Sequence, residues 1–297
     1  MSDKTKGIVF TIISAVAYGL TPLLCPLAYA ANATTETVVF LRNFFALPIL
    51  LIIILYNKID MKLSMKQLLQ IVLVSVCGMA ITNVLLYSGY KYLPVGTVTT
   101  LHFLYPVFVS LIGIVFFKEK LGKVKGLVLT VATCGIFFFI ETGGSVDFKN
   151  ALIGMIISIA SGLTYSFYMV AIEQFKLKEL NSYKLTFYIT LFTCIAVGIY
   201  AGLTNTFVVF TMQPIGFVYT IGIAIGAAFI AVYTLQLGIK YLGATTASIF
   251  CTFETVTAVI GGMIFLNESL SVSKLIGCIL ILGAVTMLSI LDNQKTK

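Results

Sequence analysis

The sequence has few charged residues and lacks the common motifs of catalysis and ATP hydrolysis. Only 10% of its 297 residues are Asp, Glu, Lys or Arg, whereas a soluble domain carries about 25%. It contains no GxSxG nucleophile motif, no HExxH zinc motif and no phosphate-binding loop of the P-loop type. We therefore do not expect an enzyme, and we do not expect this chain to hydrolyse nucleotides.

Residues that bind metals or form disulfides are also scarce. The chain has one histidine, six cysteines and no tryptophan. A single histidine, His102, excludes a metal cluster built from histidines. The cysteines lie inside apolar segments without CxxC spacing, where they act as small apolar residues at helix contacts. We therefore expect no metal site and no cofactor.

Long apolar blocks dominate what is present. Hydrophobic residues make up 59% of the chain, and the mean hydropathy is +1.06. A block of about 20 apolar residues spans a bilayer as a helix. The sequence therefore predicts an all-α polytopic membrane protein with ten transmembrane helices and no soluble domain. The predicted spans are 7–30, 36–56, 67–90, 95–117, 124–140, 150–171, 184–203, 214–239, 243–265 and 272–290.

The net charge of +8 is explained by where the basic residues lie. With a cytoplasmic N-terminus, 15 lysines fall on the inner side of the ten predicted spans and 3 on the outer side. This bias is typical of the positive-inside rule. It predicts a multi-pass protein of the plasma membrane with both termini in the cytoplasm. The basic excess is then a topology signal, and we expect no nucleic acid partner.

The chain repeats itself with a shift of 149 positions. Residues 87–121 align with 235–270, and a weaker match with a shift of 147 places SAVAYG (14–19) on SGLTYS (161–166). Several identities carry the longer match. They are Gly89 and Gly238, Lys91 and Lys240, Leu93 and Leu242, Thr97 and Thr246, Glu119 and Glu268, and Leu121 and Leu270.

The repeat predicts two halves of five helices each. We expect the first repeat at 1–140, an external linker at 141–149 and the second repeat, with a short cytoplasmic tail, at 150–297. Because five is odd, the second repeat enters the membrane from the opposite side. The segment KEKLGKVK of the first half has four lysines, whereas its counterpart NESLSVSK has one. Inverted repeats of this kind build many secondary transporters, with the solute site where the halves meet.

The whole chain resembles the drug/metabolite transporter superfamily, EamA-type. The resemblance is carried by Tyr18-Gly19, by Arg42 and by LYPVFVSLIGIVFFKEKLG (104–122), in which Pro106 precedes Glu119 by 13 residues. Tyr18 stands where the family often has Trp. In the second half, Glu254-Thr255 is the counterpart of Tyr105-Pro106, so the usual Pro is missing there and a carboxylate stands beside its position. The resemblance implies a transporter of small organic solutes and leaves open which solute and whether protons are coupled.

Three ionisable residues lie deep in predicted spans, where a charge costs about 2.5–3.5 kcal/mol and usually faces a cavity or a partner. Glu254 is interpreted as a proton-coupling residue or as the counter-charge of a cationic solute. The alternatives are a protonated Glu254 hydrogen-bonded to a neighbouring helix and a fixed pair with Arg42. His102 is expected to face the cavity as a proton relay or as a neutral hydrogen-bonding group. Arg42 is expected to form a structural or gating ion pair, or to attract the carboxylate of a zwitterion.

Polar and aromatic residues follow helical spacing on the faces expected to meet. Because Glu254 takes the place of Tyr105 in the repeat, both are expected to face the cavity. The other candidates combine tyrosines with two amides, and each has a plain helix-to-helix hydrogen bond as its alternative. These candidates are Tyr18, Tyr87, Tyr165, Tyr168, Tyr233, Asn83 and Gln236.

The sequence therefore predicts a secondary active transporter that moves a small organic metabolite, such as an amino acid or amine, by alternating access. A non-transporting membrane scaffold or sensor and an uncoupled uniporter are the alternatives. The expected partners are the solute and the lipid bilayer. Proton coupling and a homodimer are left open.

Overall fold

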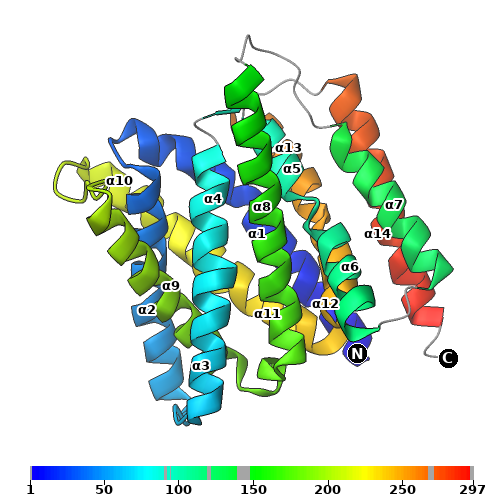
Figure 1. The fold of residues 1–297 in the computed structure, drawn as a ribbon, viewed down its shortest axis with the longest axis horizontal. Coiled ribbons are helices and arrows are strands. Elements are labelled where there is room, and N and C mark those ends of the chain that lie inside the picture. The colour runs from blue at the N-terminus through cyan, green and yellow to red at the C-terminus, as the bar shows by residue number, and fades with distance from the viewer. Residues whose placement is uncertain are drawn as a thin grey trace.

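A computed structural model describes residues 2–89, 92–93, 95–118, 122–138, 148–266 and 271–294. Throughout these ranges the regular structure is helical and no strand occurs, as Figure 1 shows. The predicted all-α class is confirmed. Glu119, Glu268 and most of the predicted linker, 141–147, lie outside the described residues.

The helices follow the predicted apolar blocks closely. They are α1 (Asp3–Ala30), α2 (Thr35–Tyr56), α3 (Met65–Leu73), the π-helix η1 (Val74–Ala80), α4 (Ile81–Gly89), α5 (Val95–His102), α6 (Tyr105–Phe117), α7 (Lys123–Phe137), α8 (Phe148–Gln174), the 3₁₀ turn η2 (Leu177–Glu179), α9 (Ser182–Leu203), α10 (Pro214–Ile223), the π-helix η3 (Ala224–Ala231), α11 (Val232–Leu242), α12 (Ala244–Cys251), α13 (Phe253–Leu266) and α14 (Val272–Gln294).

Eight helical segments in the described ranges are long and apolar enough to cross a membrane. The two remaining predicted spans correspond to α7, which has 15 residues, and to α14, in which Leu275–Ala284 forms a shorter apolar stretch. Ten crossings therefore stay a prediction. The eight are Asp3–Ala30, Thr35–Tyr56, Met65–Gly89, Val98–Phe117, Lys149–Gln174, Ser182–Leu203, Pro214–Leu242 and Ala244–Phe265.

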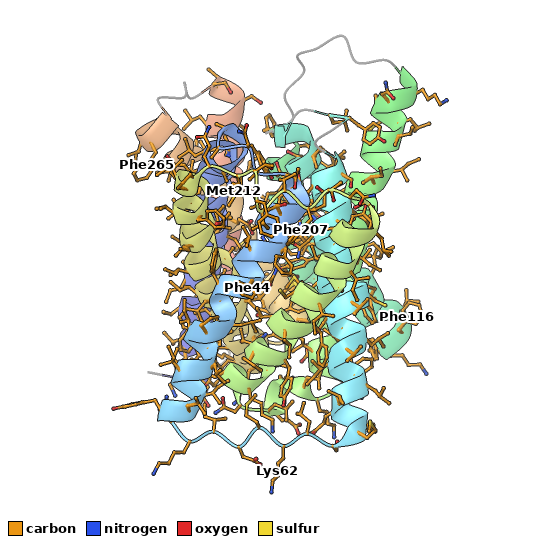
Figure 2. All side chains as sticks on the ribbon, turned by 90° about the vertical axis from the view of Figure 1, so that its left-hand side faces the viewer. Phe44, Lys62, Phe116, Phe207, Met212 and Phe265 are labelled. Carbon is orange, nitrogen blue, oxygen red and sulfur yellow. The ribbon has the colours of Figure 1, made fainter. Side chains whose placement is uncertain are left out.

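The outside of the bundle is apolar along its sides. Phe44 is 49% exposed, Phe116 74% and Phe265 67%, and Figure 2 shows them on the flanks, with Lys62 at one end of the bundle. Exposed aromatic rings at this density suit contact with lipid rather than water. The chain is therefore a multi-pass membrane protein.

Two apolar blocks are interrupted near their middles. The block of α5 and α6 breaks at Phe103-Leu104, and the block of α12 and α13 breaks at Thr252, 149 positions after Phe103. At the first break Pro106 has no backbone N–H to donate. At the second, the Thr252 hydroxyl donates to the Ile249 carbonyl at 2.7 Å, which satisfies a backbone acceptor there.

The two π-helices also occupy equivalent places. The segments η1 (Val74–Ala80) and η3 (Ala224–Ala231) each sit between α-helices of a long block, and a shift of 149 nearly superimposes their ranges. Such π segments in long helices are often found at functional sites. Pro106 predicts a bend in the first half, but the second break and the π segments were not foreseen from the sequence.

Equivalent helices of the two halves make equivalent packing contacts. Helix α1 packs on α11 and α13, and α8 packs on α4 and on the pair α5 and α6, while α2 packs on α9 and α7 on α14. In Figure 1, α7 and α14 lie side by side and run in opposite directions. The first turn of α1 and the last turn of α14 lie at the same end of the bundle.

A pair of glycines shows how similar these contacts are. A Cβ on Gly7 of α1 would lie 2.7 Å from the Leu242 side chain, and a Cβ on Gly154 of α8 would lie 2.7 Å from the Leu93 side chain. Gly154 is the counterpart of Gly7, and Leu242 is the counterpart of Leu93. Close approach of the helices therefore requires glycine at the same position in both halves.

Candidate functional site

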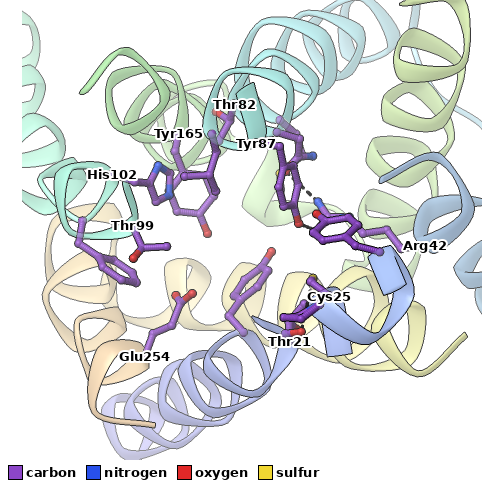
Figure 3. Close-up of a pocket in the computed structure, with 16 residues that line it drawn as sticks. Thr21, Cys25, Arg42, Thr82, Tyr87, Thr99, His102, Tyr165 and Glu254 are labelled. Atoms are coloured by element: carbon purple, nitrogen blue, oxygen red, sulfur yellow. Dashed lines mark hydrogen bonds between the residues drawn. The ribbon is translucent and has the colours of Figure 1, made fainter. Parts of the chain in front are cut away.

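A cavity of about 350 Å³ lies within the bundle, between residues of both halves (Figure 3). The first half contributes α1, α2, η1, α4, α5 and Phe103 at the helix break, and the second half contributes α8 and α13. The lining combines one carboxylate, one guanidinium, one imidazole, several hydroxyls and aromatic rings. It consists of Tyr18, Thr21, Cys25, Pro26, Tyr29, Arg42, Met79, Thr82, Asn83, Leu86, Tyr87, Thr99, His102, Phe103, Tyr165 and Glu254.

Glu254 lies in the first turn of α13, directly after the helix break. Its side chain points into the cavity, with Tyr165 on another side of the same space (Figure 3). In the described part of the chain, no hydrogen bond or ion pair engages its carboxylate. The α1 helix holds the backbone in place, because a Cβ on Gly19 would lie only 2.6 Å from the Glu254 carbonyl oxygen. The backbone of Glu254 is thus fixed against α1, while its carboxyl group faces the cavity.

Arg42 lies on the other side of the cavity from Glu254 (Figure 3). It projects from α2, and only 8% of the residue is exposed. One terminal nitrogen donates to the Asn83 amide oxygen at 2.8 Å, and the other donates to the Tyr87 hydroxyl at 3.3 Å. Among described residues, Arg42 and Glu254 form no salt bridge, so the fixed pair given as the alternative for Glu254 is absent. Both partners are neutral, so they orient the guanidinium without compensating its positive charge.

His102 ends α5 and is fixed by a short chain of hydrogen bonds. Its Nδ1 lies 2.9 Å from the Ser161 hydroxyl, and that hydroxyl donates to the Ser158 carbonyl at 2.6 Å. Since a serine hydroxyl has one proton to give, its oxygen must accept from the imidazole. We therefore assign the proton to Nδ1, which leaves Nε2 of a neutral ring as a hydrogen-bond acceptor.

Seven of the eleven predicted site residues line the cavity. They are Tyr18, Arg42, Asn83, Tyr87, His102, Tyr165 and Glu254. The prediction missed Thr21, Cys25 and Tyr29, which follow Tyr18 at helical spacing and so share its face of α1. Extending the stripe from Tyr18 along the helix would have found them. Thr82 and Thr99 carried no such signal, because isolated threonines are common in membrane helices.

The other four predicted residues do not line this cavity. Tyr105, Tyr168 and Gln236 are 1% or less exposed, so the expectation that Tyr105 shares the cavity with Glu254 is wrong for this conformation. Tyr233 stacks on Tyr183 with ring centroids 4.3 Å apart. Helical spacing groups residues on one face of a helix but does not say whether neighbouring helices cover that face.

A second hollow of about 410 Å³ lies between α1, α10 and η3. Its lining is almost entirely aliphatic, and Thr21 is shared with the central cavity. It offers no charged group to orient a polar solute, and the central cavity is therefore the better candidate site.

Comparison with known proteins agrees with this architecture. Residues 5–140 and 152–290 each match the EamA-like transporter family. The chain belongs to this family. A solved crystal structure shares the fold over 99% of both chains with a TM-score of 0.79, at 14% identity.

Relatives of the EamA-like chain include uncharacterized transporters from bacteria. One from Synechocystis is 27% identical over 72% of this chain and 65% of its own length. One from Haemophilus influenzae is 27% identical over 59% and 58%, and YcbK of Bacillus subtilis is 23% identical over 93% and 90%. The chain thus covers less than two thirds of the first two relatives.

Proposed function

We propose that this EamA-like protein is a secondary active transporter that binds a small organic metabolite in the central cavity and moves it by alternating access. The single observation that carries the proposal is the cavity itself. It joins residues of both halves, and its acidic side chain has no protein partner in the described ranges. A structural bundle would fill such a space with aliphatic side chains, as buried charge is costly in a membrane.

We further propose that the halves, 1–140 and 150–297, are inverted repeats joined by the external linker 141–149, with ten crossings. The equivalent helix breaks and π segments support this proposal. The equivalent helix contacts in the two halves support it too. In such transporters the solute site lies where the repeats meet, and rocking one repeat against the other exposes it to alternate sides.

The lining of the cavity favours a solute with a positive group and an apolar part, such as an amine or an amino acid. Glu254 supplies a negative charge, and Tyr18, Tyr165 and Phe103 supply rings that attract cations and apolar groups alike. Arg42, on the other side, would attract a carboxylate if the solute carries one. A volume of about 350 Å³ is at the lower end of ordinary ligand sites, which suits a small metabolite.

Glu254 is proposed to recognise the cationic group and, in a coupled cycle, to exchange it for a proton. A carboxylate without a fixed partner can bind either, but not both at once. That competition is the simplest physical basis of antiport. The plasma membrane and cytoplasmic termini are part of the same proposal.

The test compares Glu254→Gln with Glu179→Gln, the same substitution at an exposed residue of η2. A thermal-shift screen of amino acids, amines and nucleosides on the purified protein first supplies a solute. In liposomes with a pH dye inside, that solute should drive proton movement through the wild type and Glu179→Gln. Glu254→Gln should fold normally and lose the coupled movement.

Unchanged coupled proton movement in Glu254→Gln would remove the carboxylate from the mechanism. Solute uptake without proton movement in any variant would indicate an uncoupled uniporter. A folded protein that neither binds nor moves any solute in the screen would favour the scaffold or sensor.

A further inference from the structure

Two hydrogen-bond acceptors of the central cavity have no protein partner within the described ranges. One is the carboxyl group of Glu254. The other is Nε2 of His102, because the Ser161 hydroxyl takes the proton of Nδ1 as its hydrogen bond. His102 lines the cavity although only 8% of the residue is exposed. A buried acceptor without a donor costs free energy, and a solute that donates to both groups would recover that cost.

The two acceptors come from the two interrupted helices. His102 is the last residue of α5, just before the first break, and Glu254 lies in the first turn of α13, just after the second. Figure 3 places both of them on one side of the cavity and Arg42 on the other. A guanidinium can only donate hydrogen bonds. The cavity therefore has acceptors at one end and donors at the other.

The His102 ring is held in one position by its neighbours. Its centroid lies 5.5 Å from that of Tyr105 and 5.4 Å from that of Tyr165, and the hydrogen bond to Ser161 fixes which nitrogen carries the proton. Its backbone is packed too, since a Cβ on Gly162 would lie 2.7 Å from the His102 carbonyl oxygen. A fixed acceptor of this kind rejects a ligand that lacks the matching donor.

We propose that His102 is a specificity-determining residue, which together with Glu254 binds an ammonium group that has at least two N–H donors. This inference rests on the proposed function, and it narrows the cationic solute to a primary or secondary amine. A tertiary ammonium would leave one acceptor unpaired, and a quaternary ammonium would leave both. The rings of Tyr18, Tyr165 and Phe103 alone would give the opposite preference, because aromatic rings bind quaternary ammonium ions well.

The test is a methylation series in which the apolar part of the probe stays constant. Phenethylamine and its N-methyl, N,N-dimethyl and N,N,N-trimethyl derivatives are all ammonium ions at neutral pH, and they carry three, two, one and no N–H donors. Their binding to the purified wild-type protein in detergent is measured by isothermal titration calorimetry. The first two probes should bind with similar affinity. Affinity should fall about tenfold between the second and the third.

Two variants test whether His102 supplies the second acceptor. His102→Phe keeps a ring against Tyr105 and Tyr165 but has no acceptor, so it should bind the first two probes about tenfold more weakly. It should bind the third at least as well as the wild type does, and the fall in affinity should move to between the third and fourth probes. His102→Gln can donate to Ser161 through its nitrogen and accept through its oxygen, and should restore the wild-type order. Tyr56→Phe, at a position that is 86% exposed, serves as the control and should leave the series unchanged.

Affinity that rises with methylation, or that does not fall between the second and third probes in the wild type, would overturn the inference. An equal loss for all four probes in His102→Phe would do the same, because it would indicate a structural role of the ring. If neither His102 variant folds, the wild-type series decides. Failure of all four probes to bind would also overturn the inference. The solute screen and the proton assay with Glu254→Gln do not depend on these amines, so the proposed function can stand while this inference fails.

Discussion

At the scale of single residues, the least expected feature is a buried arginine oriented by neutral side chains. Arg42 was expected to pair with an acid, but its observed hydrogen bonds go to Asn83 and Tyr87. Pairing with Glu254 would cancel both charges and leave the cavity nearly neutral. Without the pair, a carboxyl group and a guanidinium lie on separate sides of one small space (Figure 3).

This arrangement predicts that Asn83 is more important for stability than an ordinary polar residue. Asn83→Leu would leave a buried guanidinium short of an acceptor, which should cost about 1–3 kcal/mol. The unfolding temperature of the detergent-solubilised protein should fall measurably. Asn83→Asp retains an oxygen at the same place and should restore it. Equal loss in both variants would show that packing, and not the hydrogen bond to Arg42, is what matters there.

Part of the cavity lining could be predicted from the sequence. Charge at mid-membrane singled out Glu254, His102 and Arg42, because a buried ionisable group needs a cavity or a partner. Tyr105 and Glu254 occupy equivalent positions, yet one is packed and the other lines the cavity. A sequence read as two similar halves does not say which of two equivalent positions is packed and which lines a cavity.

At the scale of helices, the apolar blocks predicted most helix ends to within a few residues. The interruptions inside them were missed. Hydropathy averages over a window and does not respond to a break of one or two residues such as Thr252. The position of Pro106 did suggest a bend in the first half, but the second half reaches a similar break without proline. There the Thr252 hydroxyl donates to the Ile249 carbonyl, which satisfies a backbone acceptor at the break.

The helix contacts predict that Gly19 and Gly226 respond differently to replacement by alanine. Gly19→Ala would place a Cβ 2.6 Å from the backbone oxygen of Glu254. Backbone cannot move aside, so α1 and α13 must separate, at about 1–3 kcal/mol. Gly226→Ala meets nothing nearer than 3.9 Å and removes a flexible residue from a helix, a gain of about 0.5–1 kcal/mol.

Thermal unfolding in detergent measures both variants. The unfolding temperature should fall for Gly19→Ala and stay level or rise for Gly226→Ala. Solute transport should decrease only in the first, since Glu254 moves with α13. Equal behaviour of the two variants would contradict the close contact between α1 and α13.

At the scale of the whole molecule, the distribution of lysines can be compared with the ends of the bundle. The connector 57–64 carries Lys58 and Lys62, and the connector 175–181 carries Lys176 and Lys178, whereas the connector 204–213 has no charged residue. Figure 1 places the first two at one end, together with the first turn of α1, and the third at the opposite end. Sequence and structure thus divide the connectors into the same two groups.

This division predicts a single orientation in the membrane, because lysine-rich connectors are retained in the cytoplasm. A reporter that is active only outside the cytoplasm should be active when inserted after Asn205 and inactive when inserted after Lys62. A reporter that fluoresces only in the cytoplasm should give the reverse result. Activity of both reporters at both positions would mean that the chain inserts in two orientations. The two proposed inverted halves would then have no fixed inner and outer sides.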